Sequence, residues 1–215
     1  PRRRRPRPSA PPQSLTGRPL RPPSLRSSRT MNVTVVGAGV AGLTVATELV
    51  ERGCKVEVID RSEGFGRGAC SWYAGGMLAP WCEGDTADEP VVRLGQEAIG
   101  WWRRHVPDVI EQGSLVVAPS RDAGELTRFA RRTEAHQTID ADELTQLEPD
   151  LHGRFRQALF FDREAHLDPR KAIAALAMNL HESGVAISYG TSLEDHRVSG
   201  SVIVDTRGFA ARDVL

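Results

Sequence analysis

Three glycines, Gly37, Gly39 and Gly42, directly follow a short apolar run at the spacing Gly-x-Gly-x-x-Gly. The first glycine of such a motif permits a tight turn, the second lets the backbone approach a diphosphate, and the third lets a helix pack against a strand. Asp60 follows 18 residues after Gly42, close to the spacing of a carboxylate that binds a ribose. These residues predict a dinucleotide site at the amino end of a helix. The predicted run is Gly37, Ala38, Gly39, Val40, Ala41 and Gly42.

The elements that must position this motif are a strand, a helix and a second strand. Residues 32–36 and 55–59 are short, β-branched apolar runs, and residues 40–52 carry apolar residues at helical spacing. Glycines alone are weak evidence, but glycines at the turn of a βαβ unit are specific. The motif serves NAD and FAD alike. Its place at the start of the folded chain, with a loop of small residues after Asp60, favours FAD.

The rest of the chain alternates between helices and strands. Helices are predicted at 88–105, 122–135, 140–147 and 168–184, and strands at 114–118, 158–161, 185–189 and 201–205. Asp168 is the expected N-cap of the last helix, with Pro169 in its first turn and Gly184 as its C-cap. A βαβ unit that is interrupted and then resumed predicts an α/β fold, a Rossmann-like domain with an inserted α+β domain. The expected division is 31–85 and 166–215 for the first domain, and 86–165 for the inserted one.

The charge of the chain is unevenly distributed. Residues 1–30 hold nine of its 28 basic residues and no Asp or Glu, which leaves 19 basic against 28 acidic residues from Met31 onward. The excess of acidic residues from Met31 onward argues against binding to nucleic acid or to an anionic membrane. Residues 1–30 are rich in Arg, Pro and Ser and are predicted to be disordered.

Several other kinds of protein and site find no support in the sequence. Cys54, Cys70 and Cys82 form no Cys-x-x-Cys pair, and their odd number predicts free thiols in a reducing cytoplasm. No apolar run reaches the roughly 18 residues that a membrane helix needs. The histidines show no metal-ligand spacing, so no metal site is expected.

Four segments carry a resemblance to a known family. Residues 31–80 resemble the D-amino-acid-oxidase superfamily of flavoproteins, and residues 74–80, AGGMLAP, are similar to the AGMLAP signature of its glycine oxidases of the thiamine-biosynthesis type. Residues 161–169 resemble the segment that leads back into the FAD domain, and residues 204–212 resemble a later flavin-contacting strand and turn. The likeness extends from Met31 to Leu215.

This resemblance implies a set of FAD-binding residues. Gly37, Gly39 and Gly42 would hold the diphosphate, and Asp60 the adenosine ribose. The other implied contacts are Arg61 beside the adenosine, Ala69, Cys70 and Ser71 at the phosphates, Gly75, Gly76 and Met77 along the isoalloxazine, Leu193 at the adenine and Gly208 in the later turn. Met77 would also lie near the substrate. No catalytic side chain is implied, because the flavin itself accepts the hydride.

Two departures from the family bear on the loop that precedes this signature. Trp72 and Tyr73 replace small residues, which leaves the packing of the loop open. Cys70 replaces a Ser or Thr, and a thiol forms weaker hydrogen bonds than a hydroxyl.

The resemblance implies an FAD-dependent oxidoreductase that oxidises the C–N bond of glycine or another small amino acid to an imine. Oxygen would reoxidise the flavin to give hydrogen peroxide, and the imine would serve the thiazole ring of thiamine. The expected partners are the amino acid and oxygen, with a homo-oligomer expected for the full-length protein.

Two alternatives stay open. The family's arginine for the substrate carboxylate comes from a later strand, so the chain is expected to be truncated at its C-terminus and inactive by itself. The other alternative is a D-amino-acid dehydrogenase or a relative of sarcosine oxidase.

Overall fold

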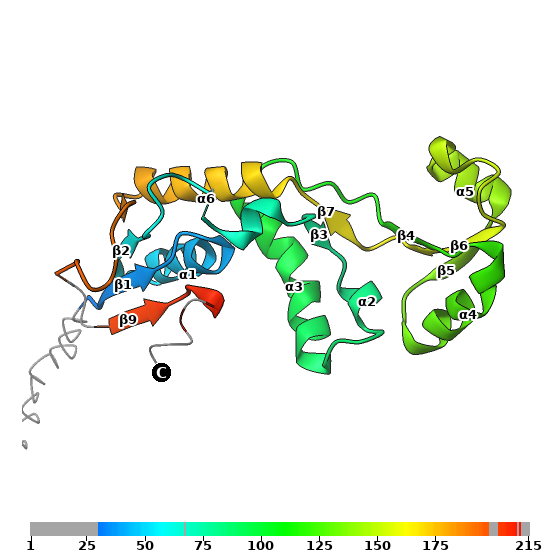
Figure 1. Ribbon diagram of the computed structural model, residues 1–215, viewed down its shortest axis with the longest axis horizontal. Helices are drawn as coiled ribbons and strands as arrows, with labels where there is room; N and C mark the ends of the chain where they lie inside the picture. The colour runs from blue at the N-terminus through cyan, green and yellow to red at the C-terminus, as the bar shows by residue number, and fades with distance from the viewer. Residues whose placement is uncertain (1–29, 67, 198–201, 210, 212–215) are drawn as a thin grey trace, which may run out of the picture.

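The structure, a computed structural model, describes residues 30–66, 68–197, 202–209 and 211 of the chain. It is elongated, with a parallel sheet at one end and an antiparallel sheet at the other (Figure 1). The segment predicted to be disordered, 1–30, lies outside the described residues except for Thr30.

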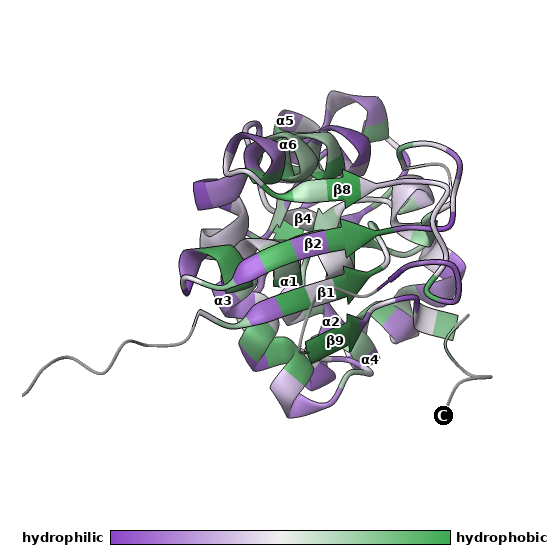
Figure 2. Ribbon diagram, turned by 90° about the vertical axis from the view of Figure 1, so that its left-hand side faces the viewer, coloured by the Kyte–Doolittle hydropathy of each residue, from purple (hydrophilic) through white to green (hydrophobic). Residues whose placement is uncertain are grey.

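Four parallel strands from both ends of the chain form the first sheet. Their order is β8-β2-β1-β9, with β1 (Asn32–Val36), β2 (Lys55–Ile59), β8 (Ala186–Ser188) and β9 (Val202–Asp205). Val33 pairs in register with Val56 on one side and with Val202 on the other. The predicted strands are confirmed, with 185–189 shortened to 186–188. In the strand predicted at 201–205, residue 201 lies outside the described residues. Figure 2 shows that the two edge strands, β8 and β9, are largely hydrophobic.

Two helices that contact each other cover one face of this sheet, namely α1 (Val40–Glu51) and α6 (Pro169–Glu182). Val35 and Val58 of the sheet pack in one core with Leu43 of α1 and Leu176 of α6, and all four side chains are inaccessible to solvent. Each such burial contributes about 1.5–3 kcal/mol, so the core fixes both helices on the sheet.

The ends of α6 follow from its sequence, with one correction. The Asp168 carboxylate accepts hydrogen bonds from the backbone N–H groups of Arg170 and Lys171, as an N-cap does. The C-cap, however, is Ser183 and not Gly184. Gly184 is the following residue, with a φ of 83°, where a glycine reverses the chain at little cost.

The second sheet is antiparallel, in the order β4-β6-β5, and carries two helices. Its elements are β4 (Ser114–Val117), η2 (Ser120–Asp122), α4 (Ala123–Arg132), β5 (Gln137–Asp140), α5 (Ala141–Leu147), η3 (Pro149–Leu151) and β6 (Gln157–Phe161). Helix α4 was predicted to reach residue 135, and this was wrong, because Thr133 leaves the helix and Ala135 adopts a φ of 59°. Asp140 is the N-cap of α5, with a complete capping box to Glu143.

Short elements and one long helix lie between the two sheets (Figure 1). They are η1 (Cys70–Tyr73), β3 (Met77–Leu78), α2 (Pro80–Glu83), α3 (Glu89–His105) and β7 (Ala165–His166), with β3 paired antiparallel to β7. In α3 the Trp101 indole N–H donates to the Glu48 carboxylate of α1 at 2.7 Å, so this helix is joined to the parallel-sheet end. Across the described residues, no helix combines the length and apolarity needed to cross a bilayer.

Candidate functional site

The turn between β1 and α1 requires glycine at two of the predicted positions. Gly37 has a φ of 112°, which disfavours any residue with a side chain. A Cβ atom at Gly42 would lie 1.8 Å from the Gly37 carbonyl oxygen, so the helix can approach the strand only without it. Gly39 is the N-cap of α1, and a Cβ there would meet Ala69 at 3.4 Å. A Cβ at Gly39 would therefore only touch the loop carrying Ala69, in ordinary van der Waals contact.

Asp60 stands at the end of β2 and holds this turn through its carboxylate. Oδ2 accepts the backbone N–H of Ala38 at 2.7 Å, and Oδ1 accepts the N–H and the hydroxyl of Ser62. The predicted ribose-binding residue therefore lies beside the glycine turn, as the spacing indicates. Ala38 itself is buried, with its N–H given to the carboxylate.

The loop after β2 folds over the amino end of α1. The Ser71 hydroxyl accepts the Val40 N–H of the first helical turn at 3.2 Å. Trp72 fixes the loop, because its ring packs on Gly66, meets Phe65 edge to face and lies under the Arg170 guanidinium of α6. The departure at Trp72 is thus accommodated as packing. The packing of Trp72 holds Ala69, Cys70 and Ser71 near the amino end of α1.

The end of β9 closes the site from the other side. The Thr206 N–H and hydroxyl both donate to the Val36 carbonyl, at 2.9 and 2.8 Å, and the hydroxyl also reaches the Gly37 carbonyl at 3.2 Å. Arg207 follows, paired with Asp205, and Gly208 then has a φ of 61°. Residues about 170 positions apart in the sequence are therefore joined at the glycine turn.

These elements surround a cavity of about 650 Å³ at the carboxyl ends of the parallel strands. Parallel α/β sheets bind ligands at this edge. Eleven of the predicted residues line the cavity: Gly37, Gly39, Val40, Ala41, Asp60, Arg61, Ala69, Cys70, Ser71, Leu193 and Gly208. Ala38 and Gly42 lie buried behind it.

Sequence reasoning missed nine further residues of the lining. They are Val36, Ser62, Gly68, Thr191, Ser192, Glu194, Thr206, Arg207 and Phe209. A signal existed for most of them, since they flank predicted positions or end predicted strands. The polar run 191–194 follows the β8 strand, and its position at the ligand-binding edge follows once β8 is placed beside β2.

Three predicted residues lie away from this cavity, toward the middle of the molecule. Gly76 has a φ of 74° and packs against the Leu167 carbonyl, where a Cβ would lie 2.0 Å away. Met77 pairs with His166, and its side chain is 65% exposed. Gly75 has open space where its Cβ would be. Their predicted contact with the isoalloxazine needs a ligand that extends beyond the cavity, which stays a prediction.

The residues present fit a dinucleotide such as FAD. The first-turn N–H groups of a helix lack intrahelical partners, and Gly39, Val40 and Ala41 bring this helix terminus to the cavity. The positive end of the helix dipole favours a diphosphate there. The Asp60 carboxylate would accept ribose hydroxyls, and Arg61 would bring positive charge to the same cavity.

Charged and polar groups around the cavity hold one another. Hydrogen bonds from Arg207 lower the pKa of the Asp205 carboxyl, so this pair stays ionised at neutral pH. Burial, and then the Asp60 charge, raise the pKa of Tyr189, whose hydroxyl therefore stays protonated. The cavity thus presents fixed charges of both signs.

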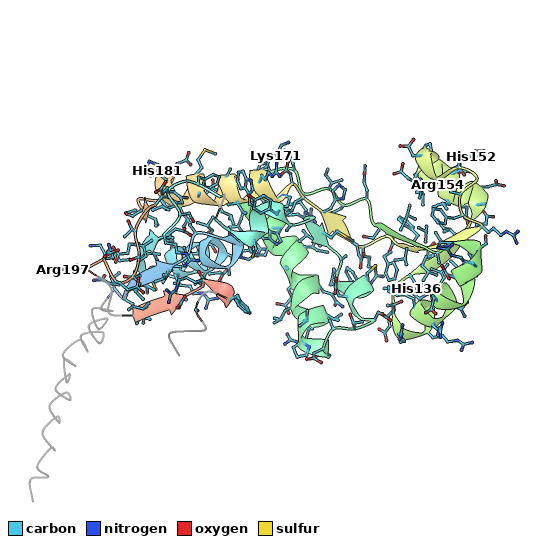
Figure 3. All side chains as sticks on the ribbon, in the orientation of Figure 1. His136, His152, Arg154, Lys171, His181 and Arg197 are labelled. Atoms are coloured by element: carbon cyan, nitrogen blue, oxygen red, sulfur yellow. The ribbon has the colours of Figure 1, made fainter. Side chains whose placement is uncertain are left out.

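No cluster of three or more His, Cys, Asp or Glu side chains within the described ranges could hold a metal ion. Figure 3 shows His136 and His152 at the antiparallel-sheet end and His181 on α6, toward the parallel-sheet end.

A Gly42→Ala substitution is expected to weaken FAD binding by at least about tenfold, because the new Cβ forces α1 away from the Gly37 carbonyl and opens the turn. Titration of the apoprotein with FAD, followed by flavin fluorescence, measures the effect. Gly124→Ala in α4 is the matched control, since its Cβ enters open space. Equal FAD affinity in the two variants would contradict this account of the turn.

The cysteines are expected to differ in reactivity. Cys70 is exposed and lines the cavity, so a maleimide should label it quickly and bound FAD should protect it. Burial, and then the Glu164 carboxylate, raise the pKa of the Cys82 thiol, so Cys82 stays protonated and resists labelling at mildly alkaline pH. Peptide mass mapping with and without FAD tests both statements. Labelling of Cys70 that is indifferent to FAD would count against the site.

Comparison with known proteins adds to this geometry. The family model for FAD-dependent oxidoreductases, DAO, matches residues 32–215. A Rhizobium etli protein provisionally named thiamine biosynthesis oxidoreductase ThiO is 50% identical over 181 residues, which make up 84% of this chain and 55% of the relative. The chain thus spans about half the length of this relative.

Solved structures share the fold. Glycine oxidase from Geobacillus kaustophilus superimposes with a TM-score of 0.63 at 23% identity, over 76% of this chain and 48% of that one. Iminodiacetate oxidase from Chelativorans sp. BNC1 superimposes with a TM-score of 0.66 at 22% identity, over 85% and 57%. The family model matches most of the chain, and the described residues of the chain form a cavity that fits FAD. The chain belongs to the DAO family of FAD-dependent oxidoreductases.

Proposed function

We propose that this protein oxidises the C–N bond of glycine or another small amino acid to an imine, for the thiazole of thiamine, with hydrogen peroxide as the second product. The main support for this proposal is the cavity at the glycine turn. The chain that forms it is 50% identical to the ThiO relative over 84% of this chain's length. The cavity supports the FAD chemistry, the relative's name supports an oxidoreductase of thiamine biosynthesis, and the resemblance of residues 74–80 to glycine oxidases supports the amino-acid substrate.

The residues of the cavity divide between the parts of the cofactor. The backbone at Gly37 and Gly39 approaches the diphosphate, and Gly42, buried behind the cavity, lets α1 pack on β1 so that the amino end of α1 stabilises the diphosphate charge. Asp60 accepts the ribose hydroxyls. Ala69, Cys70 and Ser71 lie where the loop meets the phosphates, and Arg61, Leu193 and Gly208 complete the binding residues. Support for these roles comes from the shared lining of one cavity.

Oxidation itself needs little from the protein's side chains. When bound, FAD accepts a hydride from the amino-acid Cα and passes its electrons to oxygen. Gly75, Gly76 and Met77 would present the backbone along the isoalloxazine, where Gly76 is fixed by the hydrogen bond from the Leu167 N–H to its carbonyl at 2.9 Å. Met77 would lie near the substrate, and its exposure supports that role.

The proposed division of labour follows the two sheets. Segments 31–85 and 166–215 form the FAD domain, supported by the parallel sheet that both supply, and 86–165 belongs to the substrate domain, supported by the antiparallel sheet. A cytoplasmic location fits the three free thiols. A homo-oligomer remains an expectation from the family.

The proposal is tested by the absorbance spectrum of the protein as its gene encodes it, purified and dialysed. We expect a yellow protein that bleaches when glycine is added without oxygen and recovers its colour in air, with one peroxide formed per turnover. An Asp60→Ala variant should lose the colour on dialysis, because the ribose contact is removed. Residues 31–215 alone, prepared in parallel, show how much of the site this part retains.

The other outcomes each exclude a different part of the proposal. Bleaching by glycine that air does not reverse indicates a dehydrogenase. Bleaching by sarcosine or a D-amino acid but not by glycine moves the substrate to those relatives. A colourless protein that binds NAD contradicts the flavin assignment.

A further inference from the structure

Arg207, at the end of β9, has a guanidinium that is held in one orientation. Its Nε donates to Asp205 Oδ1 at 3.0 Å and its Nη2 to Oδ2 at 2.7 Å. The Arg207 backbone N–H also donates to Oδ1, at 3.1 Å. Only 15% of the Arg207 side chain is exposed. A planar cation fixed in this way differs from an ordinary surface arginine, which samples many conformations.

The guanidinium lines the same cavity as the loop that follows β8, which includes Ser192, Leu193 and Glu194. This loop is fixed at the ribose side of the cavity, because the Thr191 N–H donates to the Asp60 carbonyl at 2.9 Å. Arg207 comes from β9, on the other side of β1 from β2 and β8, but the Glu194 carboxylate of this loop acts electrostatically on its guanidinium. Arg207 therefore lies within reach of the residues at the adenosine end, if Asp60 holds the ribose.

The charges around Arg207 argue against a contact with phosphate. Asp205 already pairs with the guanidinium, and the Glu194 carboxylate adds a second negative charge that acts on it. A diphosphate would meet an arginine whose charge is compensated, whereas the amino end of α1 offers N–H groups without intrahelical partners. The planar face of a guanidinium, in contrast, stacks on aromatic rings even when its edge is paired.

We propose that Arg207 packs its guanidinium against the adenine ring of FAD, with Asp205 as the positioning residue that orients it. The inference rests on FAD as the cofactor and on the proposed placement of the ribose at Asp60. It is independent of which amino acid the protein oxidises.

The test is calorimetric titration of the apoprotein, as its gene encodes it, with FAD, ADP, AMP and FMN. Arg207→Ala should weaken the binding of FAD, ADP and AMP by the same factor. We expect a factor of about five to thirty, the range of a cation–aromatic contact. Binding of FMN, which has no adenine, should be unchanged. Arg207→Lys should recover at most a small part of the lost affinity, because an ammonium keeps the charge without the planar face that stacks on the ring. Arg163→Ala, an exposed arginine between β6 and β7, is the matched control with unchanged affinities.

Three results would overturn the inference. A loss of affinity that is larger for ADP than for AMP, or one that the Arg207→Lys substitution avoids, assigns Arg207 a contact with the diphosphate. An equal loss for FMN, together with a lower melting temperature, assigns it a structural role. Failure of the unmodified protein to bind FAD removes the inference together with the cofactor site, while a flavin-loaded protein inert to glycine removes only the proposed substrate.

Discussion

The close approach of helix α1 to strand β1 is the constraint on which the rest of the site depends. Gly42 lies so near the Gly37 carbonyl that a single Cβ would force the two elements apart. Thr206 donates to both carbonyls of the same turn, so strand β9 can join the sheet only when the turn is closed. Asp60 completes the arrangement through the Ala38 N–H. One contact point thus sets the sheet order and the cofactor cavity together.

The same constraint explains why the two ends of the described chain meet. Strands β1 and β2 come before the second sheet in the sequence, and β8 and β9 come after it, yet all four are parallel neighbours. Their carboxyl ends must share one edge, which is where the glycine turn, Asp60, the loop 191–194 and Arg207 converge. The intervening α+β part is connected through α3, whose Trp101 reaches Glu48 of α1. The cavity is therefore a product of topology as well as of the motif.

Sequence reasoning succeeded where the signal is local. The glycine motif, the helix that begins after Asp140 and the Asp168–Pro169 helix start are each decided by neighbours within a few residues. Strands β3, β5 and β7 were missed because two to four residues carry little periodicity, and their pairing partners lie elsewhere in the chain. Arg207 lies in the segment 204–212 that the resemblance placed at the flavin, but it was not named there, and the pairing of β9 with β1 is what brings it to the cavity. For Trp72 the packing on Gly66 was not visible in the sequence either.

The central claim is that FAD lies along the carboxyl edge of the parallel sheet, with its diphosphate at the amino end of α1. A crystal structure of the protein with FAD tests this most directly. The account predicts ribose oxygens at the Asp60 carboxylate, diphosphate oxygens at the backbone of residues 39–41, and the flavin extending toward Gly75, Gly76 and Met77. A dinucleotide bound elsewhere, or bound at this edge with its diphosphate away from α1, would contradict the account.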